Sequence, residues 1–187
     1  MTRIGIVLGT TRPGRVGPQV ANWVQRTARE HSGTEFETVD IADYDLPLFD
    51  EPRSPLMGDY EHPHTRKWSA KIAEFDGFVF VTPEYNRSIP SALKNAIDYL
   101  YAEWTNKAAG FVAYGSNVGG ARAAEHLRLI AAGLHIATVR TQLNLSLISD
   151  FESFTTFVPT DRHTATLHQM LTEVIAWSGA LAPLRAA

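Results

Sequence analysis

The chain has 187 residues, of which 44% are hydrophobic and 20% charged, and its net charge at neutral pH is −3. This composition is typical of a soluble globular protein, and we expect residues 1–187 to form a single domain. The weak negative charge leaves no basic stripe for nucleic acid, and the absence of cysteine excludes disulfides, thiolate nucleophiles and Cys-ligated metals.

Short apolar runs alternate along the chain with segments of helical periodicity. The runs predict strands at 3–9, 34–40, 77–82, 107–114 and 135–140. The helical patterns lie at 16–28, 68–75, 93–101, 124–134 and 167–175. Strict alternation predicts an α/β protein whose parallel sheet is covered on both faces. Five strands favour a flavodoxin-like three-layer sandwich of strand order 2-1-3-4-5, in which the ligand lies between the first and third strands.

The loop after the first expected strand, residues 9–16, has the glycine-rich character of a phosphate-binding loop. It does not match a P-loop, because Arg15 and Val16 stand where Lys and a hydroxyl residue are required. The Rossmann pattern also fails, since the glycines of 9–17 have the wrong spacing. Asp40 ends the second expected strand, where a Rossmann acid would bind ribose, but without those glycines it is weak evidence.

A phosphate monoester suits this loop better. Thr10 and Thr11 supply hydroxyl groups, and the helix that starts near Val16 presents free N–H groups. Arg12 and Arg15 supply two positive charges, which can balance the charge of roughly −1.5 to −2 on a phosphate monoester. The alternative is a tight solvated turn with surface arginines.

A second informative loop, residues 82–90, leaves the carboxyl end of the third expected strand, where open α/β sheets place their ligands. Tyr85 offers a flat face and a hydroxyl, and Asn86 offers a donor and an acceptor, which suits a planar heterocycle with polar edges. Pro90 suits the first turn of the following helix, with Ser88 or Ile89 near its cap. The alternative is that Tyr85 is a half-buried aromatic side chain of the turn and Asn86 a turn former.

A third loop, residues 115–120, follows the fourth expected strand and contains Gly115 and Ser116. Its glycines either let the backbone approach a ligand or a neighbouring helix, or form a turn that needs a positive φ.

Residues 41–63 have no clear period and contain four prolines. Such a segment is a lid, a binding loop or a contact surface, or else a plain connector. His62 and His64 form the only close histidine pair of the chain, without an acidic helix motif beside them, and we expect no metal site.

The first two loops together resemble the NAD(P)H-dependent FMN reductase family, and the resemblance covers most of the chain from Ile4 to about Ala132. The motifs that carry it are Gly-Thr-Thr-Arg-Pro-Gly-Arg at 9–15 and Pro-Glu-Tyr-Asn at 83–86. The family commonly has Gly-Ser-x-Arg-x-x-Ser in the first loop. This sequence keeps Gly9 and Arg12, but it has Thr10 for the first Ser and Arg15 for the second, so Arg15 serves either the FMN phosphate or NADPH.

The resemblance implies FMN as cofactor and NADPH as hydride donor, with NADH possible. It also implies a set of cofactor-binding residues in the three loops, and no acid–base residue is required because the flavin carries the reaction. These residues are Thr10, Thr11, Arg12, Arg15, Val16, Pro83, Glu84, Tyr85, Asn86, Ser88, Gly115 and Ser116.

The implied activity is transfer of hydride from nicotinamide C4 to flavin N5, after which the electrons pass to free flavin, a quinone, an azo compound or a metal ion. The family also implies a homodimer or homotetramer whose subunits meet beside the flavin, and we expect Tyr99, Tyr101 and Trp104 in that interface. We further expect a cytoplasmic protein, because no segment has the pattern of a signal peptide or a membrane span.

Two other functions remain open from the sequence. One is a flavodoxin-type electron carrier, which holds FMN without oxidising nicotinamide. The other is a non-redox ligand-binding domain that retains the phosphate loop.

Overall fold

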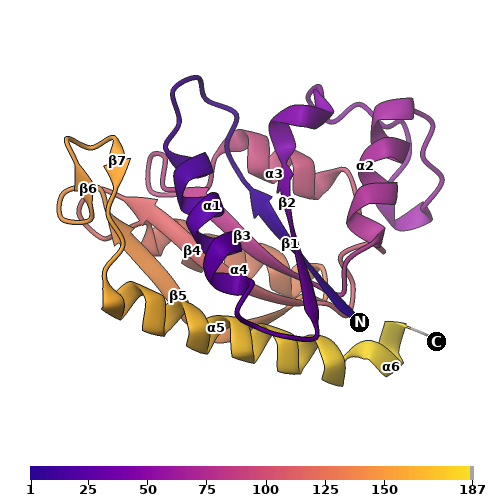
Figure 1. Ribbon diagram of the computed structural model, residues 1–187. Coiled ribbons are helices and arrows are strands. Elements are labelled where there is room, and N and C mark those ends of the chain that lie inside the picture. The colour runs from indigo at the N-terminus through magenta and orange to yellow at the C-terminus, as the bar shows by residue number, and fades with distance from the viewer. Residues whose placement is uncertain (186–187) are drawn as a thin grey trace.

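The computed structural model describes residues 1–185 and has a five-stranded parallel sheet at its centre (Figure 1). The strands are β1 (Thr2–Leu8), β2 (Thr34–Asp40), β3 (Gly77–Pro83), β4 (Ala108–Gly115) and β5 (Ala137–Ser146). Their order, β2-β1-β3-β4-β5, confirms the predicted flavodoxin-like topology. Strand β5 extends six residues past the predicted end at 140. It is an edge strand with several exposed or half-buried polar positions, so its sequence lacks a continuous apolar run.

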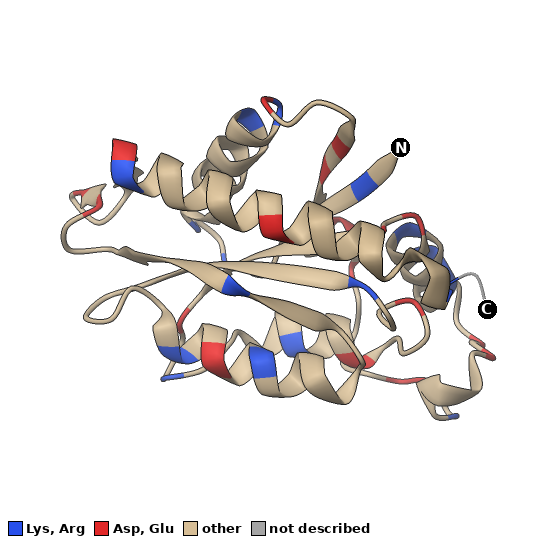
Figure 2. Cartoon of the chain, turned by 90° about the horizontal axis from the view of Figure 1, so that it is seen from below, with Lys and Arg blue, Asp and Glu red and all other residues tan. Residues whose placement is uncertain are grey.

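The helices form one layer on each face of the sheet, as Figure 2 shows. They are α1 (Gly17–Ala28), α2 (Pro63–Ala73), α3 (Ser91–Asp98), α4 (Ala121–Gly133), α5 (Asp161–Ala180) and α6 (Ala182–Arg185). Helices α1 and α5 pack in one hydrophobic cluster with the sheet, and α2, α3 and α4 pack in the other. Within residues 1–185, no helix combines the length and apolar content needed to cross a membrane.

Strand β1 shows how the sequence builds both layers. Ile6 belongs to the cluster under α1 and α5, whereas the next residue, Val7, belongs to the cluster under α2, α3 and α4. Successive side chains of a strand point to opposite faces, so a strand covered on both sides must be apolar at every position. Strands β3 and β4 are accordingly buried along their whole length.

Residues 41–63 are held against helix α3 and contain two 3₁₀ helices, η1 (Ile41–Tyr44) and η2 (Pro55–Met57). The Asn95 amide donates a hydrogen bond of 2.6 Å to the carbonyl of Pro47. The Tyr99 hydroxyl donates one of 2.9 Å to the carboxylate of Asp50. Specific hydrogen bonds therefore hold this segment against α3 and Tyr99, and it is not a loose connector.

Two aromatic residues that we expected at a subunit interface are core residues instead. Tyr99 and Trp104 are both fully buried within the chain. The Trp104 ring packs edge-on against Phe78 with ring centroids 4.9 Å apart, and its indole N–H donates to the carbonyl of Ile97 at 3.1 Å. Helix α3 ends at Asp98, and the chain after it packs Trp104 against Phe78 of the sheet and Tyr99 against Phe49 of residues 41–63.

A short hairpin that the sequence did not predict connects β5 to α5. Its strands are β6 (Phe151–Glu152) and β7 (Thr156–Phe157). The Gln19 side chain of α1 anchors it, donating to the carbonyl of Thr155 at 2.8 Å and accepting from the N–H of Phe157 at 3.1 Å. The hairpin tip carries Phe154, whose side chain is exposed.

Candidate functional site

Three loops meet at the carboxyl ends of β1, β3 and β4, beside the point where the strand order reverses. They enclose a cavity of about 160 Å³. Of the twelve predicted cofactor residues, eight line it: Arg12, Arg15, Val16, Pro83, Glu84, Tyr85, Gly115 and Ser116. The fold therefore brings together residues that lie up to 104 positions apart, from 12 to 116, at one edge of the sheet.

The first loop presents one unpaired cation. Arg12 is exposed, and no side-chain hydrogen bond or ion pair of its guanidinium group occurs within residues 1–185. Thr10 is buried, and its hydroxyl lies 3.1 Å from the hydroxyl of Tyr85, so it connects the first loop to the second. Thr11 does not line this cavity but faces a neighbouring one beside η1 and α3. Arg12 is thus the group in this loop that is free to receive an anion.

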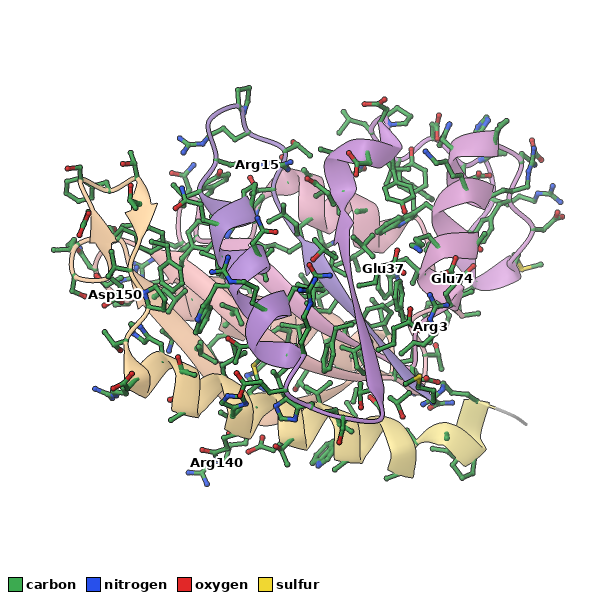
Figure 3. The ribbon with its side chains drawn as sticks, in the orientation of Figure 1. Arg3, Arg15, Glu37, Glu74, Arg140 and Asp150 are labelled. Atoms are coloured by element: carbon green, nitrogen blue, oxygen red, sulfur yellow. The ribbon has the colours of Figure 1, made fainter. Side chains whose placement is uncertain are left out.

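Arg15 is already paired. Its guanidinium group donates to both carboxylate oxygens of Asp40, one of them at 3.0 Å, and to the carbonyl of Thr10. Asp40 also accepts a hydrogen bond of 3.0 Å from the N–H of Ala42, at the start of η1. Figure 3 shows Arg15 between the first loop and the end of β2. The assignment of Arg15 to the FMN phosphate or to NADPH stays a prediction, and in this structure Asp40 balances the charge of Arg15.

The second loop contains a tight turn at residues 85–88. Tyr85 and Ser88 exchange two backbone hydrogen bonds of 2.9 and 3.0 Å, and the residues between them, Asn86 and Arg87, have φ values of 48° and 70°. Asn86 is exposed at the turn and does not line the cavity. Ser88 does not line it either, and its hydroxyl lies 2.9 Å from Nδ1 of His126. The turn, not a contact with the cavity, accounts for the position of both residues.

Glu84 joins the second loop to helix α4. Its nearly buried carboxylate accepts a hydrogen bond of 3.1 Å from the backbone N–H of Arg122 and one of 2.8 Å from the Arg122 guanidinium group. In the third loop, a Cβ at Gly115 would come within 3.0 Å of the Gly120 nitrogen and 3.2 Å of the Glu84 Cβ. Gly115 is therefore required for the close approach of the second and third loops.

Three residues that the sequence did not indicate complete the cavity wall: Tyr114, Leu147 and Phe154. Burial raises the pKa of the Tyr114 phenol, so the side chain stays neutral. Tyr114 could have been found from its place at the end of a predicted strand. Leu147 and Phe154 follow β5 in a stretch without periodicity, and no sequence pattern marks them.

Two neighbouring histidines, His62 before helix α2 and His64 in its first turn, contact one aspartate. His62 and His64 stack with ring centroids 5.1 Å apart, and Nε2 of His64 lies 3.0 Å from the Asp50 carboxylate. Among residues 1–185, no group of three or more His, Asp or Glu side chains is arranged to hold a metal ion.

The cavity has the chemistry of a site for a ring system that carries an anion. Arg12 supplies a positive charge, whereas Val16, Leu147 and Phe154 supply apolar walls and Tyr85 a polar aromatic edge. The enclosed volume is below the roughly 300–1,000 Å³ of common ligand pockets, so the cavity could enclose only part of a mononucleotide. Sheet and cavity together define a flavodoxin-like protein with a nucleotide-type site at the switch point of its strands.

Comparison with known proteins identifies the family. A family model described as NADPH-dependent FMN reductase matches residues 2–150. An NAD(P)H-dependent FMN reductase of Schizosaccharomyces pombe is 40% identical over 150 residues, which cover 79% of this chain and 74% of the relative. A 2-hydroxy-1,4-benzoquinone reductase of a Burkholderia species is 35% identical over 141 residues, or 72% of each chain. The chain belongs to the NADPH-dependent FMN reductase family.

A solved structure shares the fold of this chain. The solved structure of FerB, a flavoenzyme NAD(P)H:(acceptor) oxidoreductase from Paracoccus denitrificans, superimposes with a TM-score of 0.76. The superposition covers 96% of this chain and 98% of that one at 20% sequence identity, so it concerns the fold alone.

Proposed function

We propose that this protein is an NAD(P)H-dependent FMN reductase that moves a hydride from NADPH or NADH to FMN. One observation carries the proposal. In a chain of this family, Arg12, Tyr85 and Gly115 line one cavity at the point where the strand order of the sheet reverses. FMN, when bound, supplies the atom that accepts the hydride. The chain binds the flavin and orients it.

Each loop has a separate part in this proposal. Arg12 holds the FMN phosphate with a charge-assisted bond, because its guanidinium group has no other partner in the described chain. Tyr85, whose hydroxyl lies 3.1 Å from the Thr10 hydroxyl, would contact the flavin ring from the cavity wall. Gly115 and Ser116 close the far side, held near the second loop by the Glu84–Arg122 contact. Val16, Leu147 and Phe154 form the apolar part of the cavity wall.

The electron acceptor in this proposal is a quinone or free flavin. Relatives named for quinone reduction support the quinone: the Burkholderia enzyme, and an NAD(P)H:quinone oxidoreductase of Solanum tuberosum that is 34% identical over 138 residues. Azo compounds and oxidised metal ions are further acceptors to assay, since reduced flavin can pass electrons to either. We place the reaction in the cytoplasm, where nicotinamide nucleotides are regenerated.

We also propose a homodimer or homotetramer. Support comes from residues 41–63 rather than from the buried aromatic residues after α3. Leu48, Leu56 and Met57 of that segment are 84%, 66% and 71% exposed, and exposed apolar surface can mark a protein–protein contact. Sedimentation at micromolar concentration tests this, and a single species of 20.7 kDa would contradict it.

An anaerobic absorbance titration tests the activity. The purified protein is mixed with FMN, and NADPH or NADH is then added while the flavin band near its visible maximum is followed. Bleaching by the nicotinamide nucleotide, followed by recovery on addition of a benzoquinone, is the expected result. A flavodoxin-type carrier would bind FMN without bleaching, and a non-redox domain would leave the spectrum of free FMN unchanged.

A further inference from the structure

A second cleft lies directly beside the flavin cavity. It has a volume of about 290 Å³ and is lined by Arg87, Ala121, Arg122, Glu125 and His126. One wall is the turn at 85–88 and the other is the first turns of α4. The Glu84–Arg122 pair separates the two spaces, because Glu84 lines the flavin cavity and Arg122 lines the cleft.

The charges around this cleft do not cancel. Arg122 is paired with Glu84 at 2.8 Å, and Glu125 lies 3.5 Å from Arg128. Arg87 is exposed, and within residues 1–185 no acidic side chain pairs with it. The cleft therefore carries an excess positive charge in a protein whose net charge is −3.

The backbone at Arg87 has an unfavourable conformation for this side chain. Tight turns in which both central residues have positive φ usually place Gly second, most often as Asn-Gly. Here the pair is Asn86-Arg87, and Arg87 has a φ of 70°. A residue with a side chain in this region is uncommon and costs free energy, and such residues concentrate at functional sites. The turn nevertheless has this unfavourable conformation, and it places the guanidinium group of Arg87 at the rim of the cleft.

His126 adds a second donor. Its Nδ1 lies 2.9 Å from the Ser88 hydroxyl. When that hydroxyl donates to Nδ1, the imidazole proton is on Nε2, and when the ring is charged both nitrogens carry protons. In these two states Nε2–H can donate to a ligand in the cleft, whereas the neutral tautomer with its proton on Nδ1 makes Nε2 an acceptor.

We propose that this cleft binds a phosphate group of the nicotinamide dinucleotide, with Arg87 as the principal contact and His126 as the second. The inference rests on the proposed function and adds to it a binding subsite for the nicotinamide dinucleotide. Two phosphates have the required chemistry: the pyrophosphate, which NADH and NADPH share, and the 2′-phosphate, which only NADPH has.

The first test is a steady-state comparison of the parent with Arg87→Asn, because asparagine tolerates positive φ and preserves the turn. Loss of one charge-assisted contact lowers kcat/KM about tenfold. A loss confined to NADPH assigns the 2′-phosphate to the cleft, and equal losses for NADPH and NADH assign the pyrophosphate. Arg87→Lys keeps the charge and should recover part of the lost rate. Unchanged kcat/KM for both nucleotides in Arg87→Asn would overturn the proposal.

The second test needs no turnover. Titration calorimetry with 2′,5′-ADP and with 5′-ADP measures phosphate binding to the parent and to Arg87→Asn, and we expect about tenfold weaker binding of at least one of them in the variant. If the parent oxidises neither NADPH nor NADH, the proposed function fails, but this titration still reports on the cleft. Equal affinity of the parent and Arg87→Asn for both nucleotides would refute the subsite even in an active enzyme.

The matched control is Arg140→Asn. Arg140 is also an exposed arginine, but it lies on the edge strand β5, on the side of helix α5 in the view of Figure 3, and it does not line the cleft. Its loss removes the same net charge from the protein without touching the turn. A decrease for Arg140→Asn equal to that of Arg87→Asn would show a general charge effect and would contradict a subsite. FMN affinity, measured by fluorescence for both variants, checks that the turn is intact.

Discussion

The pair of Arg15 and Asp40 offers the sharpest test of how the first loop works. Arg15 joins the carbonyl of Thr10 to the end of β2, and the two charged side chains are only 16% and 22% exposed. We therefore expect Arg15 to brace the loop and not to bind the FMN phosphate. Arg15→Ala should lower both the stability of the protein and its affinity for FMN, because the loop that carries Arg12 is then less well ordered.

The size of the effect follows from the geometry. A two-pronged guanidinium–carboxylate pair that is mostly shielded from water contributes about 1–2 kcal/mol after desolvation is subtracted. The FMN affinity should fall about fivefold, which corresponds to roughly 1 kcal/mol of lost preorganisation. Asp40→Asn keeps an acceptor for the N–H of Ala42 but removes the charge, and it should lower FMN affinity about two- to threefold.

Urea unfolding of the parent, both single variants and the double variant measures the coupling, and fluorescence titration measures FMN binding. We expect a coupling free energy of about 1–2 kcal/mol, since each single change already breaks the same pair. The two explanations of Arg15 differ in the sign of the effect of Asp40→Asn. If Arg15 served the phosphate directly, removing its competitor Asp40 would strengthen FMN binding. Tighter FMN binding by Asp40→Asn would therefore refute the bracing role.

Three further outcomes are expected. Arg12→Ala should weaken FMN binding ten- to a hundredfold and leave riboflavin, which lacks the phosphate, almost unchanged; parallel losses in a fluorescence titration would mean that the loop does not bind the phosphate. Asn86→Ala should weaken FMN binding several-fold, because Asn86 has a φ of 48° that alanine tolerates poorly. Two controls should bind FMN like the parent: Asn86→Gly, since glycine tolerates that angle, and Asn117→Ala, since Asn117 lies outside the cavity. Equal FMN dissociation constants for the parent and Asn86→Ala would contradict the turn argument. Burial lowers the pKa of Lys107 to about 8, and the nearby charge of Arg185 acts in the same direction. Between about pH 8 and 10.4 the unfolded chain therefore binds more protons than the folded one. The free energy of unfolding consequently rises with pH in that window. Lys107→Met should accordingly be more stable than the parent at pH 7 by about 1–3 kcal/mol, less so near pH 9.5, and a difference in urea unfolding that does not change with pH would refute this.

The alternation of apolar runs and helical stripes was enough to predict the sheet, its strand order and the edge at which the ligand site lies. These properties depend on local patterns: the apolar strand Ile4–Leu8 needs cover on both faces, and loops that leave parallel strands must come together at one edge. Two of the three loops could also be predicted, because the motifs at 9–15 and 83–86 are each a continuous stretch of sequence.

The partners of individual side chains were decided only by the tertiary structure. Arg15 is paired with a carboxylate 25 residues away, and whether its charge is free depends on where β2 ends in space. Tyr99 and Trp104 resemble interface residues in the sequence but are buried, because residues 41–63 cover Tyr99 and the sheet residue Phe78 packs against Trp104. Phe154 reaches the cavity because Gln19, more than 130 residues earlier, holds its hairpin against α1. Such contacts join segments that are far apart in the sequence. They depend on how the elements pack, and local sequence periodicity carries no information about that.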